Sequence, residues 1–316
     1  MILRYWIQAA RPKTLPLSVS GILVGMGIAG VQLEFFYESS DFWIIFSLAI
    51  CTTLAFQIVS NFSNDYSDYL KGTDNDSRIG PERMVASGKI SLNQMRIATI
   101  LMSILAIVFS CLLIYFSRSY ITERSQLLYI ILAGLCVLAA VTYTVGKNAY
   151  GYRGLGDLMV FVFFGLVSVL GSYSLFGFDF EPIVLCFAIS VGLWSTAVLN
   201  LNNLRDFHND ERSQKRTLVV KIGLKNATYY HILLVLGGYI CWMLGLISLF
   251  QLSGFVPLFL SSLPSILLFL HLRRILLIKS SELEKLNGEL AVVALTTFFS
   301  CLFLFLVLRL FIYVSI

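Results

Sequence analysis

The chain has 316 residues, of which 58% are hydrophobic and only 13% are charged. Soluble domains average about 45–50% apolar and about 25% charged residues. Because so few charged side chains cannot cover a surface in contact with water, the composition excludes a soluble globule. It indicates a protein that lies in a lipid bilayer.

Uncharged apolar runs recur nine times along the chain. Each is long enough for a transmembrane helix, which needs about 17–25 residues. The runs are continuously apolar, whereas the strands of a membrane barrel would alternate. We therefore predict an all-α, polytopic membrane bundle of about nine transmembrane helices, built as a single domain over residues 1–316. The predicted spans are residues 15–31, 42–60, 97–116, 127–145, 158–178, 182–204, 227–250, 255–272 and 290–308.

The eighth run differs from the others because it contains Pro257 and Pro264. Proline removes a backbone hydrogen bond, so a kink is expected there. The boundary between the seventh and eighth runs, at residues 251–254, is the least distinct.

The basic residues predict the orientation of the chain. The N-terminal tail and the loops after the even-numbered runs hold 20 of the 23 Lys and Arg residues. By the positive-inside rule, these segments lie in the cytoplasm and the C-terminus lies outside a cell (inner) membrane. The net charge of +5 then reflects topology and attraction to membrane lipid. It does not require a nucleic-acid partner.

Two cytoplasmic segments, residues 61–96 and 202–226, are unusually polar and follow the second and sixth runs. If the helices continue into them, residues three and four apart share a face. Each segment then presents one polar stripe on the same side of the membrane. The stripes consist of Asn61, Asp65 and Asp68, and of Asn202, Asp206 and Asp210.

Stacked carboxylates repel one another unless a cation lies between them. Hard oxygen ligands without Cys or His favour Mg²⁺, so these six residues are candidate ligands for Mg²⁺ bound together with a diphosphate. Basic side chains nearby would supply further positive charge to the phosphate oxygens. These are Lys71, Arg78, Arg83, Arg205, Lys215 and Arg216. Any single charge could instead be a solvated loop residue, but the repeated Asn-x-x-x-Asp spacing favours a site. For Lys71 and Lys215, a role as topology signal or lipid anchor stays open.

His231 and His271 have no ligand-spaced partner in the sequence. We expect both at helix ends, in packing or interfacial roles and not as metal ligands.

Several motifs carry a resemblance to a known family. They read Asn64-Asp65-Tyr66 through Gly80-Pro81 to Ser87-Gly88, Gly151-Tyr152-Arg153-Gly154-Leu155-Gly156-Asp157, and Asn202-Asn203-Leu204-Arg205-Asp206 with Lys215-Arg216-Thr217-Leu218. The segment Arg11-Pro12-Lys13-Thr14 fits as well. On these motifs the chain resembles the UbiA superfamily of intramembrane prenyltransferases. Within it, the chain is similar to the branch that acts on 1,4-dihydroxy-2-naphthoate in menaquinone synthesis.

The resemblance implies a UbiA-like bundle and a Mg²⁺-dependent reaction. A polyprenyl group would pass from polyprenyl diphosphate to 1,4-dihydroxy-2-naphthoate, with loss of CO₂ and diphosphate, to give demethylmenaquinone. The family's catalytic, metal-binding aspartates map onto Asp65, Asp68, Asp206 and Asp210. Asn64 joins the expected substrate-binding residues by the same resemblance.

Two further side chains are candidates with ordinary alternatives. The ring of Tyr143 could stabilise a carbocation, but aromatic residues also commonly face lipid. Asp157, which opens the predicted fifth helix, could position the acceptor or simply complement the helix dipole.

Two other functions stay open on the sequence. A sister prenyltransferase acting on 4-hydroxybenzoate or homogentisate would share the donor site. A secondary transporter would belong to another class, and it predicts ionisable residues near the bilayer midplane or broken helices in two matching halves. The acidic residues here lie at predicted helix ends, which favours the enzyme.

Overall fold

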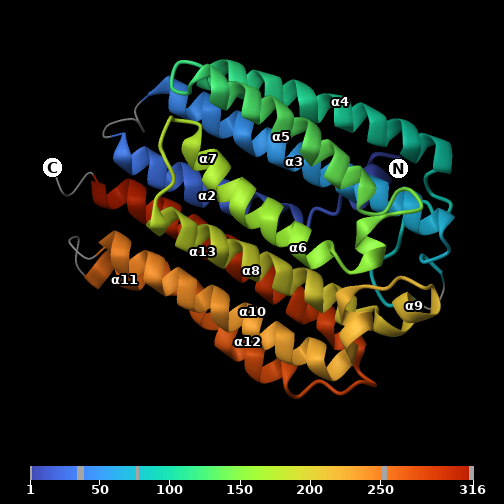
Figure 1. The fold of residues 1–316 in the computed structure, drawn as a ribbon. Helices are drawn as coiled ribbons and strands as arrows, with labels where there is room; N and C mark the ends of the chain where they lie inside the picture. The colour runs from blue at the N-terminus through green and yellow to red at the C-terminus, as the bar shows by residue number, and fades with distance from the viewer. Residues whose placement is uncertain (1, 34–38, 76–77, 251–254, 313–316) are drawn as a thin grey trace.

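The computed structural model describes residues 2–33, 39–75, 78–250 and 255–312, and every regular element in these ranges is a helix (Figure 1). The longer elements are α1 Ile2–Ala10, α2 Leu15–Gln32, α3 Ser40–Leu70, α4 Leu92–Ser117, α5 Glu123–Thr142, α8 Pro182–Arg205, α10 Leu218–Phe250 and α13 Leu286–Ile312. The shorter ones are η2 Tyr150–Arg153, α6 Gly156–Val160, η3 Phe161–Leu170, α7 Gly171–Ser174, α9 Phe207–Arg212, α11 Phe255–Ser262, η4 Pro264–Ile266, α12 Leu267–Ile275 and η5 Leu283–Lys285.

The helices confirm the predicted all-α membrane bundle. In the described residues, eight helical stretches are long and apolar enough to cross a membrane, and a ninth span results if the bent pair Val256–Ser262 and Pro264–Ile275 is counted as one. The two parts of that pair meet at 43°. The bend falls at Pro264, one of the two prolines expected to kink this run. The uncertain boundary at residues 251–254 lies outside the described residues.

The helices α2 and α8 form the interior of the bundle. In the most apolar 18-residue windows, 78% of α2 and 61% of α8 is buried, against 22% of α4 and 11% of α5. Figure 1 shows α3, α4 and α5 together on one side of α2 and α8, with α10, α11 and α12 on the other side. The outer helices therefore present apolar side chains to lipid, while α2 and α8 are covered by protein.

Small residues allow close packing in the centre of the bundle. A Cβ on Gly165 of η3 would lie 2.5 Å from the backbone oxygen of Ala188 on α8. Packing of this kind drives helix association in lipid, where apolar burial gives no preference between protein and acyl chains. The η3 segment has π-helical turns, which are rare and frequent at functional sites.

The segments that follow α3, α5 and α8 lie at the same end of the bundle as α1, and the C-terminal end of α13 lies at the opposite end (Figure 1). The helix α3 continues to Leu70, ten residues past the predicted apolar run, so the motif Asn61 to Asp68 is helical. The second motif spans the end of α8 and the short helix α9.

The expected position of His231 at a helix end was wrong. It lies inside α10, eight residues after Gly223, where a φ of +80° kinks the helix. His231 is buried, and its Nε2 lies 2.7 Å from Nε2 of His271 on α12. Nδ1 of His271 lies 2.6 Å from Oε2 of Glu289 on α13, so the pair ties three helices together.

Candidate functional site

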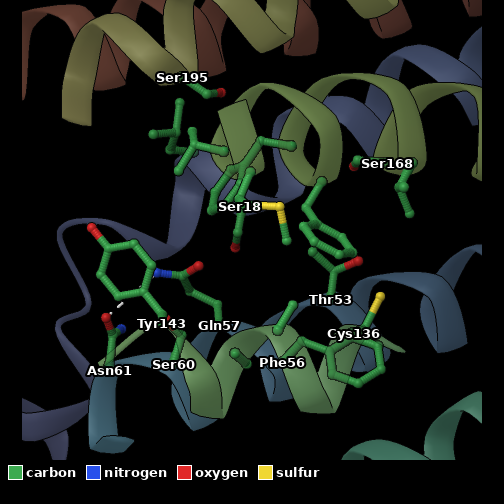
Figure 2. Close-up of a pocket in the computed structure, with 18 of the residues that line it drawn as sticks. Ser18, Thr53, Phe56, Gln57, Ser60, Asn61, Cys136, Tyr143, Ser168 and Ser195 are labelled. Carbon is green, nitrogen blue, oxygen red and sulfur yellow. Dashed lines mark hydrogen bonds between the residues drawn. The ribbon is translucent and has the colours of Figure 1, made fainter. Parts of the chain in front are cut away.

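A cavity of about 360 Å³ lies between α3, α4 and α5 on one side and α2, η3 and α8 on the other. Along α3 its lining runs from Ala49 to Asp68, a distance of about 28 Å at 1.5 Å per residue. Figure 2 shows Gln57, Ser60 and Asn61 near Tyr143 on one side of the cavity, with Phe56 and Cys136 further along. One end of the cavity is therefore polar and the remainder is mostly apolar.

The cavity brings together part of the predicted site. The predicted residues that line its polar end are Asn61, Asn64, Asp68, Arg83, Tyr143, Asn202 and Lys215. They come from α3, the loop after it, the segment after α5, and the end of α8 with the loop after α9. The two polar segments thus meet at one place.

Asp68 is the acidic side chain that faces this cavity. Tyr152 donates a hydrogen bond of 2.8 Å to Asp68 Oδ1. Arg83 and Lys215 each place a nitrogen 3.9 Å from Asp68 Oδ2. Burial, followed by the charge of Asp68, raises the pKa of the Tyr152 hydroxyl, which keeps it protonated and able to donate. Asp68 thus lies between two cations and one neutral donor.

Asp65 has a different position from Asp68. Its two carboxylate oxygens accept hydrogen bonds of 3.1 Å from the backbone N–H groups of Met84 and Val85. These contacts fix the loop between α3 and α4 immediately after Arg83. Asp65 therefore positions Arg83 at the cavity, and each of its oxygens retains a lone pair for a further ligand.

The second motif is organised around Arg205. Its guanidinium forms a two-point ion pair with Asp206, at 2.9 and 2.6 Å, and donates to Asn202 Oδ1 at 2.7 Å. A further bond of 2.9 Å reaches Oδ1 of Asn287 on α13. Arg78 from the first loop lies 3.9 Å from Asp206. Asp206 is therefore neutralised by arginines from both segments.

Asp74 and Asp210 extend the acidic cluster. Asp74 Oδ1 lies 3.2 Å from Arg78 and 3.4 Å from Arg83, and Asp210 Oδ1 lies 3.9 Å from Lys215. Burial raises the pKa of each of these carboxyls to about 7. Both sites therefore favour a neutral carboxyl or an additional cation.

Eight of the fifteen predicted residues do not line the cavity, and they are Asp65, Lys71, Arg78, Asp157, Arg205, Asp206, Asp210 and Arg216. Lys71 donates to the backbone oxygen of Thr144 at 2.5 Å and lies over the ring of Tyr152. Arg216 is exposed. Asp157 is buried at the start of α6, with Oδ1 lacking a hydrogen-bond partner, and does not line the cavity.

Other cavity-lining polar residues were not predicted as site residues. They include Arg11, Gln57, Ser60 and Ser195. Arg11 belongs to one of the sequence motifs on which the family resemblance was based. Gln57 and Ser60 precede Asn61 on the same helix and could have been found by extending its polar stripe by one turn.

The oxygen-rich cluster fits a diphosphate-bound Mg²⁺ better than a metal bound by protein alone. In the described ranges, no three His, Cys, Asp or Glu side chains converge closely enough to hold a metal by themselves. Asp210 Oδ2 and Asp74 Oδ2 are buried without a hydrogen-bond partner. Mg²⁺ commonly takes one or two carboxylates together with waters and substrate phosphates, which suits this donor set.

Comparison with known proteins identifies the family. The UbiA prenyltransferase family matches residues 19–293. The chain belongs to this family. It is 41% identical over 260 residues to the 1,4-dihydroxy-2-naphthoate octaprenyltransferase of Escherichia coli (strain K12), covering 82% of this chain and 81% of that protein. Membership makes the chain a prenyltransferase of the UbiA family and excludes the alternative of a secondary transporter.

Solved UbiA structures share the fold. A UbiA homolog from Archaeoglobus fulgidus has a TM-score of 0.65 at 12% identity, covering 96% of this chain and 99% of that one. The structure of a UbiA homolog from the same organism bound to GPP and Mg²⁺ has a TM-score of 0.56, also at 12% identity, covering 94% and 99%.

Proposed function

We propose that the chain transfers a polyprenyl group from polyprenyl diphosphate to 1,4-dihydroxy-2-naphthoate in a Mg²⁺-dependent reaction. Diphosphate and CO₂ leave, and the product is demethylmenaquinone. The observation that carries the proposal is a single cavity that joins a cluster of opposed charges to a long apolar section. A donor with a charged head and a hydrocarbon tail matches both parts.

The polar end would hold the diphosphate. Arg83 and Lys215 line the cavity within 4 Å of Asp68, so cationic donors and a carboxylate face the same space. Arginine and lysine bind phosphate oxygens through charge-assisted hydrogen bonds. As the allylic C–O bond breaks, these donors would stabilise the charge that develops on the leaving group.

Mg²⁺ would be held by Asp68 and Asp210, with Asp65, Asp206, Asn61 and Asn202 as the other predicted ligands. When bound, it neutralises the negative charge of the diphosphate and of the carboxylates around it. A UbiA homolog of the same fold was crystallised with GPP and Mg²⁺, which supports this assignment.

The apolar section would hold the prenyl chain. Its walls include Leu113, Ile114 and Leu132 on the side of α4 and α5, and Phe163 and Val167 on the opposite side. Such walls exclude water from the prenyl carbocation that forms when the diphosphate leaves. The electron-rich ring of the acceptor can then attack the allylic carbon.

The acceptor assignment depends on the relatives. The 41% identity to a protein named 1,4-dihydroxy-2-naphthoate octaprenyltransferase covers four fifths of both chains. We also propose a multi-pass location in the cell (inner) membrane, with the motif end of the bundle in the cytoplasm and the C-terminus outside. The strong bias of Lys and Arg to that end supports the orientation.

The purified protein, incubated with a polyprenyl diphosphate, Mg²⁺ and a panel of aromatic acceptors, tests the proposal by mass spectrometry. We expect product from 1,4-dihydroxy-2-naphthoate with the mass of the prenylated, decarboxylated ring. Product from 4-hydroxybenzoate alone, or no turnover with any donor, would contradict the proposal.

A further inference from the structure

Arg11, in the link between α1 and α2, has an unusual backbone conformation. Its φ angle is +54°, in the left-handed region that residues other than glycine seldom adopt. In the described ranges, Gln214 is the other non-glycine residue with positive φ. Arg11 N–H donates to the carbonyl of Gln8 at 3.1 Å, and Thr14 N–H donates to the carbonyl of Arg11 at 3.0 Å. Backbone strain held by its surroundings is common where a side chain must point into a site.

The side chain of Arg11 lines the cavity. Its guanidinium donates to the backbone oxygen of Asn61 on α3 at 3.5 Å. The amide of Asn61 in turn donates to the carbonyl of Ala10 at 2.9 Å. Two hydrogen bonds therefore fix this link against α3, so the guanidinium is held at a defined depth.

Arg11 has no acidic partner there. The other basic side chains that line the polar end are paired, because Arg83 and Lys215 lie within 4 Å of Asp68. Among the described residues, no carboxylate oxygen lies within 4.0 Å of a nitrogen of Arg11. Arg11 is thus a fixed cation at the cavity wall with donors available for an anion.

Arg11 lies at the inner edge of the charged cluster. Asp65, one turn after Asn61 on α3, is the carboxylate whose charge acts most strongly on it, but Asp65 does not line the cavity and its oxygens accept from Met84 and Val85. The partner of Arg11, Asn61, lies seven residues before Asp68 on α3, which corresponds to about 10 Å along the helix axis. At this level the other polar lining is neutral, and Figure 2 shows Gln57, Ser60 and Tyr143 around Asn61. One cation among neutral hydrogen-bonding groups suits a singly charged, hydroxylated ring better than a diphosphate.

We propose that Arg11 binds the carboxylate of the aromatic acceptor and selects acceptors that carry one. The inference rests on the proposed function and identifies the residue that recognises the acceptor. Arginine pairs with carboxylates through two parallel N–H···O bonds, and the cavity screens this pair from water. Gln57, Ser60 and Tyr143 would hydrogen-bond the ring hydroxyls.

Steady-state kinetics of Arg11→Gln test the proposal with three constants. These are KM for 1,4-dihydroxy-2-naphthoate, KM for the prenyl diphosphate, and Ki for 1,4-dihydroxynaphthalene, a competitor without the carboxylate. We expect the acceptor KM to rise at least about 30-fold, while the donor KM and the Ki change less than about threefold. Arg11→Lys, which keeps the charge but not the two-point geometry, should give an intermediate acceptor KM.

Two further variants separate binding from folding. Arg11→Gly relieves the positive φ, so its melting temperature should equal or exceed that of the wild type while its acceptor KM rises as in Arg11→Gln. Lys13→Gln changes an exposed basic residue of the same link and should leave all three constants unchanged.

A rise in donor KM with an unchanged acceptor KM would overturn the proposal, since Arg11 would then contact the diphosphate. Unchanged kinetics of Arg11→Gln beside normal wild-type turnover would overturn it too, and would leave the proposed function intact. No turnover of 1,4-dihydroxy-2-naphthoate by the wild type would overturn both.

Discussion

Lys215 lies 3.9 Å from Asp68 Oδ2 and connects two segments that are almost 150 residues apart in the chain. The same ammonium group lies 3.9 Å from Asp210 Oδ1. It therefore bridges the first acidic motif, on α3, and the second, on α9. This bridge is where the two polar segments of the sequence become one site.

Removal of the Lys215 charge should weaken donor binding. We expect Lys215→Gln to raise the KM for the prenyl diphosphate about tenfold, since a lost charge-assisted contact costs roughly 1.5–3 kcal/mol. Lys225→Gln, an exposed lysine on α10, is the control and should behave as the wild type. Equal kinetics of the two variants would show that Lys215 does not contact the donor.

The buried carboxyl groups of Asp74 and Asp210 should make the stability of the protein depend on pH. Burial raises both pKa values from 3.8 to about 7. Because the folded-state pKa lies above the unfolded value, their stabilising contribution is complete below pH about 4 and is lost as the pH rises through about 7. In EDTA, the melting temperature should fall between pH 6 and pH 8.

Mg²⁺ with diphosphate should reverse that trend, because cation binding favours the ionised carboxyls and releases protons. Apparent Mg²⁺ affinity should therefore rise from pH 6 to pH 8, which calorimetry in two buffers of different ionisation enthalpy can measure. Asp74→Asn should reduce the pH slope in EDTA. A flat melting temperature in EDTA would contradict the assigned pKa values.

Asn287 on α13 should position the second motif through Arg205. Asn287→Ala removes the acceptor 2.9 Å from the Arg205 guanidinium, and we expect kcat to fall about three- to tenfold. Asn287→Asp keeps an oxygen acceptor and should retain most of the activity. Loss in both variants would instead point to a disturbed first turn of α13.

Gly165 tests the packing between η3 and α8. A Cβ there would lie 2.5 Å from the Ala188 carbonyl, whose backbone cannot move aside cheaply. Gly165→Ala should lower the melting temperature by several degrees, since overpacking costs about 1–3 kcal/mol. Gly134 on α5 has no atom within 4 Å of an added Cβ, so Gly134→Ala should be neutral or slightly stabilising. Equal melting temperatures would contradict the close contact.

Much of the fold could be predicted from the sequence because lipid imposes a simple rule. Uncharged runs must be helices, and the helical bundle and the bend at Pro264 followed from that rule and from proline chemistry. The membership of the UbiA family was also predicted, from the spaced motifs around Asp65 and Asp206.

Contacts across the bundle could not be predicted in the same way. The pairing of Arg205 with Asn287 depends on how α13 packs against α8, and no local spacing reports it. The histidine pair was missed for a similar reason, since its partners lie 40 residues apart. The different surroundings of Asp65 and Asp68 depend on the path of the loop after α3, which the helical stripe does not reveal.

Activity of Asp68→Asn as a function of Mg²⁺ concentration tests the central claim most directly. Asparagine keeps the oxygen that accepts from Tyr152 but removes the charge that would hold a cation at the diphosphate. We predict that turnover of prenyl diphosphate and 1,4-dihydroxy-2-naphthoate falls at least about 100-fold at any Mg²⁺ concentration, with the melting temperature unchanged. Wild-type turnover and an unchanged Mg²⁺ requirement in this variant would contradict a diphosphate site at Asp68.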